Sequence, residues 1–293
     1  MKNKMIEQIN KKDIPKVSIG MPVYNGEKFI REAIDSLLAQ TFSDFELIIS
    51  DNCSTDKTQE ICKEYASKDP RVKYLRQIEN IGIVANFEYV LNIAIAKYFM
   101  WAACDDIWST DWIMNLYGLL EKSKVGAAFG RVLPVNQESK QIPHIATKKT
   151  FRLVGNVFFR RLRFYLQFEG DGKANLFHSL FLRNQISELK ISSYSYDYLV
   201  IYSLLSKISF ESTKSVYFYK RNYPTSSGNL PNLNKTLFFK IMRLVFPFPK
   251  TLIKDYLGDA NFLEKLAMIL LLPCKFLLAY VSIMHSLMIR NFS

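Results

Sequence analysis

This chain of 293 residues contains few cysteines and no glycine-rich nucleotide-binding motif after its first predicted strand. The four cysteines lie at positions 53, 62, 104 and 274, with no C-x-x-C pair. This spacing argues against a disulfide framework or a cysteine-zinc module and fits a reducing compartment. Neither a G-x-G-x-x-G fingerprint nor a Walker-type lysine loop follows the first predicted strand, which disfavours dinucleotide oxidoreductases and P-loop enzymes. Residues 1–12 lack the apolar core of a signal peptide, so we expect cytosolic synthesis without export.

Charge is distributed unevenly along the chain. The net charge is +12, and hydrophobic residues make up 49% of the sequence, enough to bury a substantial core. Residues 1–150 carry 20 basic and 19 acidic side chains, whereas residues 151–293 carry 19 and 8. A nearly neutral half joined to a basic half suggests chemistry in the first and an anionic partner surface for the second. No recognisable nucleic-acid-binding module is present, so we expect no nucleic-acid partner.

Hydrophobic periodicity predicts an α/β fold for the first 130 residues. Short apolar runs alternate with helical spacing, which indicates right-handed crossovers and a mainly parallel sheet with helices on both faces. The predicted strands are Val17–Met21, Phe45–Ile49, Val72–Leu75, Tyr98–Ala103 and Val125–Phe129. Later in the chain the pattern weakens. Residues 151–168 mix aromatic residues with four arginines, and only a helix near Tyr194–Leu205 and a strand near Ser215–Tyr219 are predicted.

Polar clusters follow three of the predicted strands, where ligands bind in parallel sheets. In PVYNGE, Tyr24 is suited to stack on a planar base; the alternative is a plain strand-to-helix loop. In DNCSTD, Asp51 is placed to accept a hydrogen bond from a nucleobase or ribose, although neighbouring residues also suit helix capping. Asp105 and Asp106 follow the fourth strand, and adjacent carboxylates are costly unless a cation or solvent compensates. Together with substrate phosphates, they suit magnesium; the alternative is a solvated loop.

The motifs resemble those of one enzyme family. The segment VSIGMPVYNGEKFIREAIDSLLAQTFSDFELIISDNCSTDKT, followed by ENIGIVANFEYVLNIAIAKYFMWAACDDIW, is similar to the N-terminal half of glycosyltransferase family 2. The close resemblance covers residues 16–130. It implies a GT-A fold, inverting transfer from a nucleoside diphosphate sugar, and Mg or Mn as cofactor. Position by position, it implies donor-site roles for Pro22, Tyr24, Glu27, Asp51, Asn80, Gly82, Asp105, Asp106 and Arg221, with Asp105 and Asp106 on the metal.

The resemblance also implies a catalytic base in the second half of the chain. Inverting transfer needs a group that takes the proton of the acceptor hydroxyl. The segment SSYSYDYLVIYSLLSKISF resembles the acidic helix start of the family, which points to Asp197. Asp171 is the second candidate, and a helix N-terminal acid stabilised by the helix dipole is the structural alternative for Asp197. Arg221 and the following Ser226 and Ser227 resemble a loop that closes over the diphosphate.

The end of the chain has a different character. Leu266–Ile289 is almost continuously apolar, interrupted by Pro273, Lys275 and His285, and Leu237–Phe246 adds an amphipathic piece. A central lysine is costly in a spanning helix, so two shorter helices broken at Pro273 fit better. We expect monotopic binding to the cytoplasmic face of the cell membrane; a helical cap or a dimer interface is the alternative.

The expected domains are an N-terminal extension (1–15), a transferase domain (16–228, divided into a nucleotide-sugar half, 16–130, and an acceptor half, 131–228) and a helical tail (229–293). The predicted activity is sugar transfer from a UDP- or dTDP-linked donor to a hydroxyl of a cell-envelope glycolipid or polysaccharide. A sugar nucleotidylyltransferase would carry a glycine-rich loop with Arg and Lys after the first strand, and PVYNGE is not such a loop. The remaining alternative is a degenerate transferase that serves as a nucleotide-sugar-binding or scaffold module. Many family members have D-x-D-D where this chain has Ala103-Cys104-Asp105-Asp106, so the first acid of that motif is missing.

Overall fold

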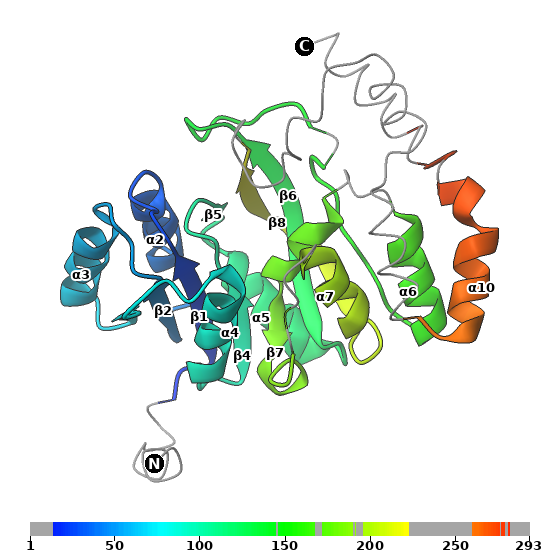
Figure 1. The fold of residues 1–293 in the computed structure, drawn as a ribbon, viewed down its shortest axis with the longest axis horizontal. Helices are drawn as coiled ribbons and strands as arrows, with labels where there is room; N and C mark the ends of the chain where they lie inside the picture. The colour runs from blue at the N-terminus through cyan, green and yellow to red at the C-terminus, as the bar shows by residue number, and fades with distance from the viewer. Residues whose placement is uncertain are drawn as a thin grey trace.

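The computed structural model describes residues 14–144, 146–167, 172–189, 191, 196–222, 260–275, 277–278 and 281. Eight strands occur in this part of the chain: β1 (Val17–Val23), β2 (Phe45–Asp51), β3 (Val72–Arg76), β4 (Tyr98–Trp101), β5 (Ile107–Trp108), β6 (Ala127–Val135), β7 (Leu180–Leu182) and β8 (Phe210–Arg221). They form one mixed sheet in the order β3-β2-β1-β4-β7-β6-β8-β5 (Figure 1). Strands β3, β2, β1 and β4 are parallel, and β7 is antiparallel to its neighbours β4 and β6.

The helices that the structure describes connect and cover these strands. They are α2 (Ile30–Leu38), α3 (Thr58–Lys68), α4 (Ile83–Ile93), α5 (Trp112–Lys122), α6 (Val157–Leu166), α7 (Tyr196–Leu204) and α10 (Phe262–Leu270), with short 3-10 turns η2 (Lys173–His178) and η3 (Arg183–Gln185). Helix α4 packs on β1 and β2, and α5 packs on β6 and β8. The predicted α/β fold and its mainly parallel first half are confirmed.

Burial explains why the first strands are readable in the sequence. Every residue of β1 and β2 is buried, because a parallel sheet is covered on both faces. Close packing of α4 on β1 depends on Gly20: a Cβ there would lie 2.7 Å from Val90 Cγ2 and 2.8 Å from Phe99 Cζ. The register pairs Val23 with Asp51, so β1 and β2 end at the same level and their following loops adjoin.

The C-terminal part packs on the second half of the sheet domain. Helix α10 lies at the edge of the molecule beside α6 (Figure 1). It ends at Leu270, and residues 272–275 are again helical, so the interruption falls just before Pro273. Within the residues that the structure describes, no helix is both long and apolar enough to cross a membrane. The amphipathic piece at 237–246 and the end of the apolar run at 282–289 lie outside the described residues.

Candidate functional site

Two loops at the carboxyl edge of the sheet are joined by reciprocal hydrogen bonds. Asn25 N donates to Ser54 Oγ at 2.9 Å, and Thr55 N donates back to Asn25 Oδ1 at 2.8 Å. Lys57 N, at the start of α3, donates to Glu27 Oε2 at 2.9 Å. The PVYNGE and DNCSTD clusters therefore form a single platform, and the predicted donor-site residue Glu27 contributes to it by capping α3.

Asn52 attaches a third loop to this platform. Its Nδ2 donates to Asn80 Oδ1 at 2.8 Å, and its Oδ1 accepts from Ile81 N at 2.9 Å. Gly82, the next residue, has φ of +84° and ψ of 161°, a conformation open essentially only to glycine. Because Gly82 starts α4, this backbone geometry turns the ENIG segment back toward the sheet edge, where Asn80 lines the pocket described next.

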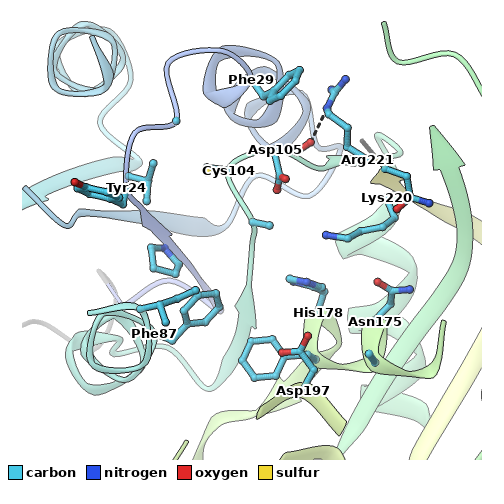
Figure 2. Close-up of a pocket in the computed structure, with 18 of the residues that line it drawn as sticks. Tyr24, Phe29, Phe87, Cys104, Asp105, Asn175, His178, Asp197, Lys220 and Arg221 are labelled. Atoms are coloured by element: carbon cyan, nitrogen blue, oxygen red, sulfur yellow. Dashed lines mark hydrogen bonds between the residues drawn. The ribbon is translucent and has the colours of Figure 1, made fainter. Parts of the chain in front are cut away.

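The loops surround a pocket of about 960 Å³. Figure 2 shows Tyr24 and Phe87 on one side of it, and Asp105, Lys220, His178 and Asp197 on the other. Of the residues predicted from the sequence, six line this pocket: Pro22, Tyr24, Asn80, Asp105, Asp197 and Arg221. The pocket thus places an aromatic surface opposite a group of charged side chains.

Asp51 is fully buried beneath the platform. Its Oδ1 accepts from Ser54 N at 2.8 Å, and its Oδ2 accepts from Tyr74 Oη at 2.7 Å and from Arg76 Nη1 at 2.6 Å. Burial by itself would raise the pKa of Asp51, but these hydrogen bonds outweigh it and hold the pKa below its usual range. The carboxylate is therefore charged and engaged in fixing the loop, and its predicted contact with the base stays a prediction.

The two acids after β4 have different surroundings. Asp105 lines the pocket, and its main-chain carbonyl accepts from Arg221 Nε at 2.8 Å. Asp106 is fully buried; its Oδ2 pairs with Lys220 Nζ at 2.9 Å, and its Oδ1 accepts from Arg221 N at 2.9 Å. Burial raises the pKa of Asp106, and the ammonium of Lys220 opposes that shift. Of the two acids, Asp105 is thus the one at the pocket wall, whereas Asp106 orients β8.

The guanidinium of Arg221 is hydrogen-bonded to acceptors within the protein. Its side chain is fully buried and donates to Asp105 O at 2.8 Å, to Gln137 O at 2.7 Å and to Glu32 Oε2 at 2.5 Å. The guanidinium also lies over the ring of Phe29. These bonds join α2 and the loops that follow β4 and β6 to the end of β8. The contact with the donor diphosphate expected of Arg221 stays a prediction.

Lys220 is the functional candidate that sequence reasoning missed. Its ammonium reaches the pocket between Asp105 and His178 (Figure 2). Burial would lower the pKa of Lys220, but the carboxylates of Asp106 and Asp105 outweigh this and raise it above its ordinary value. The side chain therefore carries a fixed positive charge in the pocket. The signal in the sequence was its position next to Arg221, directly after the predicted strand near Ser215–Tyr219.

Asp197 and His178 form the far end of the charged side. Asp197 lies in the first turn of α7, and burial raises its pKa to about 6, against the opposing effect of Lys220. His178 Nδ1 lies 3.0 Å from Trp101 O. Because a carbonyl only accepts, Nδ1 carries the proton. Burial and the charge of Lys220 lower the pKa of His178 to about 4, so the ring is neutral at pH 7.

Two cysteines lie in the site loops, and three residues discussed above from the sequence fall outside the described part of the chain. Cys53 and Cys104 are partly buried within the site loops, and burial raises the pKa of the Cys104 thiol, which disfavours a role for it as a nucleophile. The second base candidate, Asp171, and the loop serines Ser226 and Ser227 lie outside the described residues.

The residues present suit a divalent cation that is shared with a substrate. Among the described residues, no three His, Cys, Asp or Glu side chains gather to hold a metal alone. Mg²⁺ commonly uses one or two carboxylates and takes its other ligands from phosphates and water. Asp105 offers such a carboxylate at the pocket wall. A role for Asp106 as the second ligand would require its carboxylate to exchange its bonds to Lys220 and Arg221, and it stays a prediction.

Comparisons with known proteins agree with this geometry. The family model described as glycosyl transferase family 2 matches residues 18–182. The glycosyltransferase GlyA of Streptococcus pneumoniae is 28% identical over 147 residues, which are 50% of this chain and 20% of that protein. The curated relatives are matched over about a fifth to a half of their own length.

Solved structures share the fold at low sequence identity. Staphylococcus aureus TarS 1–349 in complex with UDP-GlcNAc superposes with a TM-score of 0.60 and 19% identity, covering 85% of this chain and 69% of that one. The mannosyltransferase PcManGT from Pyrobaculum calidifontis, in complex with GDP-Man and Mn²⁺, gives a TM-score of 0.56 and 16% identity, covering 93% and 75%. These matches establish that the chain shares the GT-A fold of such enzymes.

Proposed function

Because this chain belongs to glycosyl transferase family 2, we propose that it moves a sugar from a nucleoside diphosphate sugar to a hydroxyl of a cell-envelope glycolipid or polysaccharide, with inversion. One observation carries the proposal. A single pocket contains four groups: an aromatic ring for a base (Tyr24), a carboxylate for a divalent cation (Asp105), an ammonium for a diphosphate (Lys220) and a second carboxylate with a raised pKa (Asp197).

The platform supports binding of the nucleotide part. Tyr24 is half exposed at the mouth of the pocket, so one ring face is accessible to a planar base. Asn80 also lines the pocket and is held by Asn52. The family resemblance that implies a nucleoside diphosphate sugar covers these loops. On that basis we propose a UDP- or dTDP-linked donor. The diphosphate then lies toward Asp105 and Lys220.

Asp197 is proposed as the base. A carboxyl with a pKa near 6 is mostly ionised at neutral pH, yet basic enough to accept a proton in the transition state. Asp197 takes the proton from the acceptor hydroxyl while that oxygen attacks the anomeric carbon. The bond between the anomeric carbon and the diphosphate oxygen breaks, and the nucleoside diphosphate leaves. Attack from the side opposite to the leaving group inverts the anomeric centre.

Lys220 is proposed to stabilise the departing diphosphate. Negative charge grows on the bridging oxygen as the bond breaks, and a fixed cation in a half-buried pocket stabilises that charge. Asp106 holds the ammonium in place at 2.9 Å, so little reorganisation is needed during the reaction. A divalent cation, when bound at Asp105 with the diphosphate, would neutralise further charge on the leaving group.

The experiment is a release assay with the full chain. UDP-, dTDP- and GDP-sugars are first ranked by thermal shift, since a ligand stabilises the folded state by RT ln(1 + [L]/Kd). Release of the nucleoside diphosphate is then measured with and without Mn²⁺ and with membrane extract as acceptor source. Acceptor-dependent release supports the proposal. Donor binding without release under every condition would instead identify a binding or scaffold module.

A further inference from the structure

Two of the three charged side chains in and just after helix α10 are buried, those of Glu264 and Lys275. Glu264 is buried against Arg161 of α6, with Oε2 2.8 Å from Arg161 Nη1 and both side chains less than a tenth exposed. Lys275, five residues after the end of α10, is also buried and donates to Tyr165 O at 2.5 Å. Of the three charged residues among the described positions 262–281, only Lys265 is exposed. The polar contacts of this segment are therefore directed toward α6.

The outer face of the same segment is apolar. Along α10, exposed hydrophobic side chains occur at i, i+1, i+4, i+7 and i+8, and more follow beyond the helix. They are Phe262 (78% exposed), Leu263 (65%), Leu266 (46%), Ile269 (58%), Leu270 (68%), Leu277 (64%), Leu278 (49%) and Val281 (57%). We call these eight residues the outer face. A surface helix in water has the opposite arrangement, with the apolar stripe inward.

This inversion indicates the medium that the outer face meets. Contiguous exposed apolar surface marks a protein or membrane contact, whereas single exposed residues need no explanation. Here the ion pair of Glu264 with Arg161 and the hydrogen bond of Lys275 to Tyr165 O keep three charges away from the surface, as expected where the surroundings are hydrocarbon. The capping box at Asn261 satisfies backbone donors at the start of α10 within the helix itself, which suits the same environment.

We propose that the outer face is a monotopic membrane-binding surface that lies in the interface of an anionic bilayer. The excess of basic side chains in residues 151–293, 19 against 8, matches an anionic headgroup layer. The net charge of +12 also opposes association of two copies, because like charges repel. Exposed Lys265 extends its charge to the headgroups while its stem lies along the apolar surface. This inference rests on α10 and the residues after it, together with the charge of the second half of the chain, and is independent of the proposed reaction.

Vesicle flotation with the full chain tests the proposal. The vesicles are phosphatidylcholine alone, or an equimolar mixture with phosphatidylglycerol. The wild type is expected to float with the mixed vesicles and to dissociate partly at high salt. Leu266→Gln/Leu270→Gln should weaken partitioning about tenfold or more, because two exposed leucines leave the apolar contact. Leu277→Gln/Leu278→Gln is a second variant, and Met114→Gln, an equally exposed apolar residue on α5, is the matched control.

Each outcome of the flotation experiment supports or overturns membrane binding by the outer face. Loss of flotation in both double variants, with an unchanged melting temperature and a normal Met114→Gln control, supports it. Three results overturn it: a wild type that floats with neither vesicle, double variants that float like the wild type, or a wild-type dimer in sedimentation velocity that the double variants convert to a monomer without any vesicle binding in the wild type.

Discussion

The assignment of Asp197 makes a quantitative prediction about pH. Its carboxyl is raised to a pKa of about 6 by burial. As a base it works only when ionised, so kcat/KM should rise with pH, reach half its maximum near pH 6 and stay level above. At pH 7 roughly nine-tenths of the carboxyl is ionised and at pH 5 roughly a tenth, which predicts an almost tenfold difference in rate.

Replacing the carboxyl should remove both rate and pH dependence. Asp197→Asn keeps the size of the side chain but cannot accept the proton, so transfer should fall about 10²–10⁴-fold. Donor affinity should change little, because the base acts only when the proton moves. The remaining activity of Asp197→Asn should no longer follow an acid limb near pH 6. The assay is nucleoside diphosphate release between pH 5 and 8, with donor binding measured separately by thermal shift.

Substitution of Lys220 supplies a second test of the acid limb of the pH–rate profile. Its ammonium lowers the pKa of Asp197, so Lys220→Gln should move the half-maximal pH upward, whereas Lys220→Arg should leave it close to the wild-type value. The position of the limb is compared, since either change also alters the maximal rate. An acid limb near pH 6 that survives in Asp197→Asn would refute the assignment and point to another group, including Asp106, whose pKa burial also raises.

Three further variants test the donor side. Asp105→Asn should fold normally yet lose metal-dependent donor binding and turnover, and unchanged activity would end its assignment as a metal ligand. Tyr24→Ala should weaken nucleotide binding by about 1–3 kcal/mol if the half-exposed ring stacks on the base, as measured by calorimetric titration. Asp51→Ala should lower the free energy of unfolding by about 1–3 kcal/mol, because Tyr74 and Arg76 lose their acceptor. Denaturant midpoints equal to the wild type would contradict that reading of Asp51.

The first half of the fold could be predicted because its strands are parallel and doubly covered. Such strands appear as continuous apolar runs, and β1 and β2 are buried at every position. The loops that follow them were also identifiable, since parallel strands end at one edge. What the pattern did not reveal is which polar side chain faces the ligand and which faces the protein, as Asp51 illustrates.

The second half was harder to predict for physical reasons. In α6, Arg160 and Arg161 are buried and donate to the main-chain carbonyls of Leu205 and Tyr202. Two inward arginines disrupt the amphipathic pattern that would otherwise reveal a helix. Strands β5 and β7 have only two and three residues, too short for an alternation to be recognised. The strand near Ser215–Tyr219 was predicted, but it extends from Phe210 to Arg221.

At the end of β8, the resemblance pointed to Arg221 as the cation for the diphosphate, whereas in the structure the ammonium of Lys220 faces the pocket. Successive side chains on a strand point to opposite sides, so of two adjacent basic residues only one is directed at the pocket centre. The choice between them follows from their chemistry. Arginine has a rigid fork of five donors, which matches the carbonyls and the carboxylate that surround the buried Arg221. Lysine is a compact charge on a flexible stem. At position 220 it therefore pairs with Asp106 while its ammonium still faces the pocket, where a departing diphosphate needs positive charge.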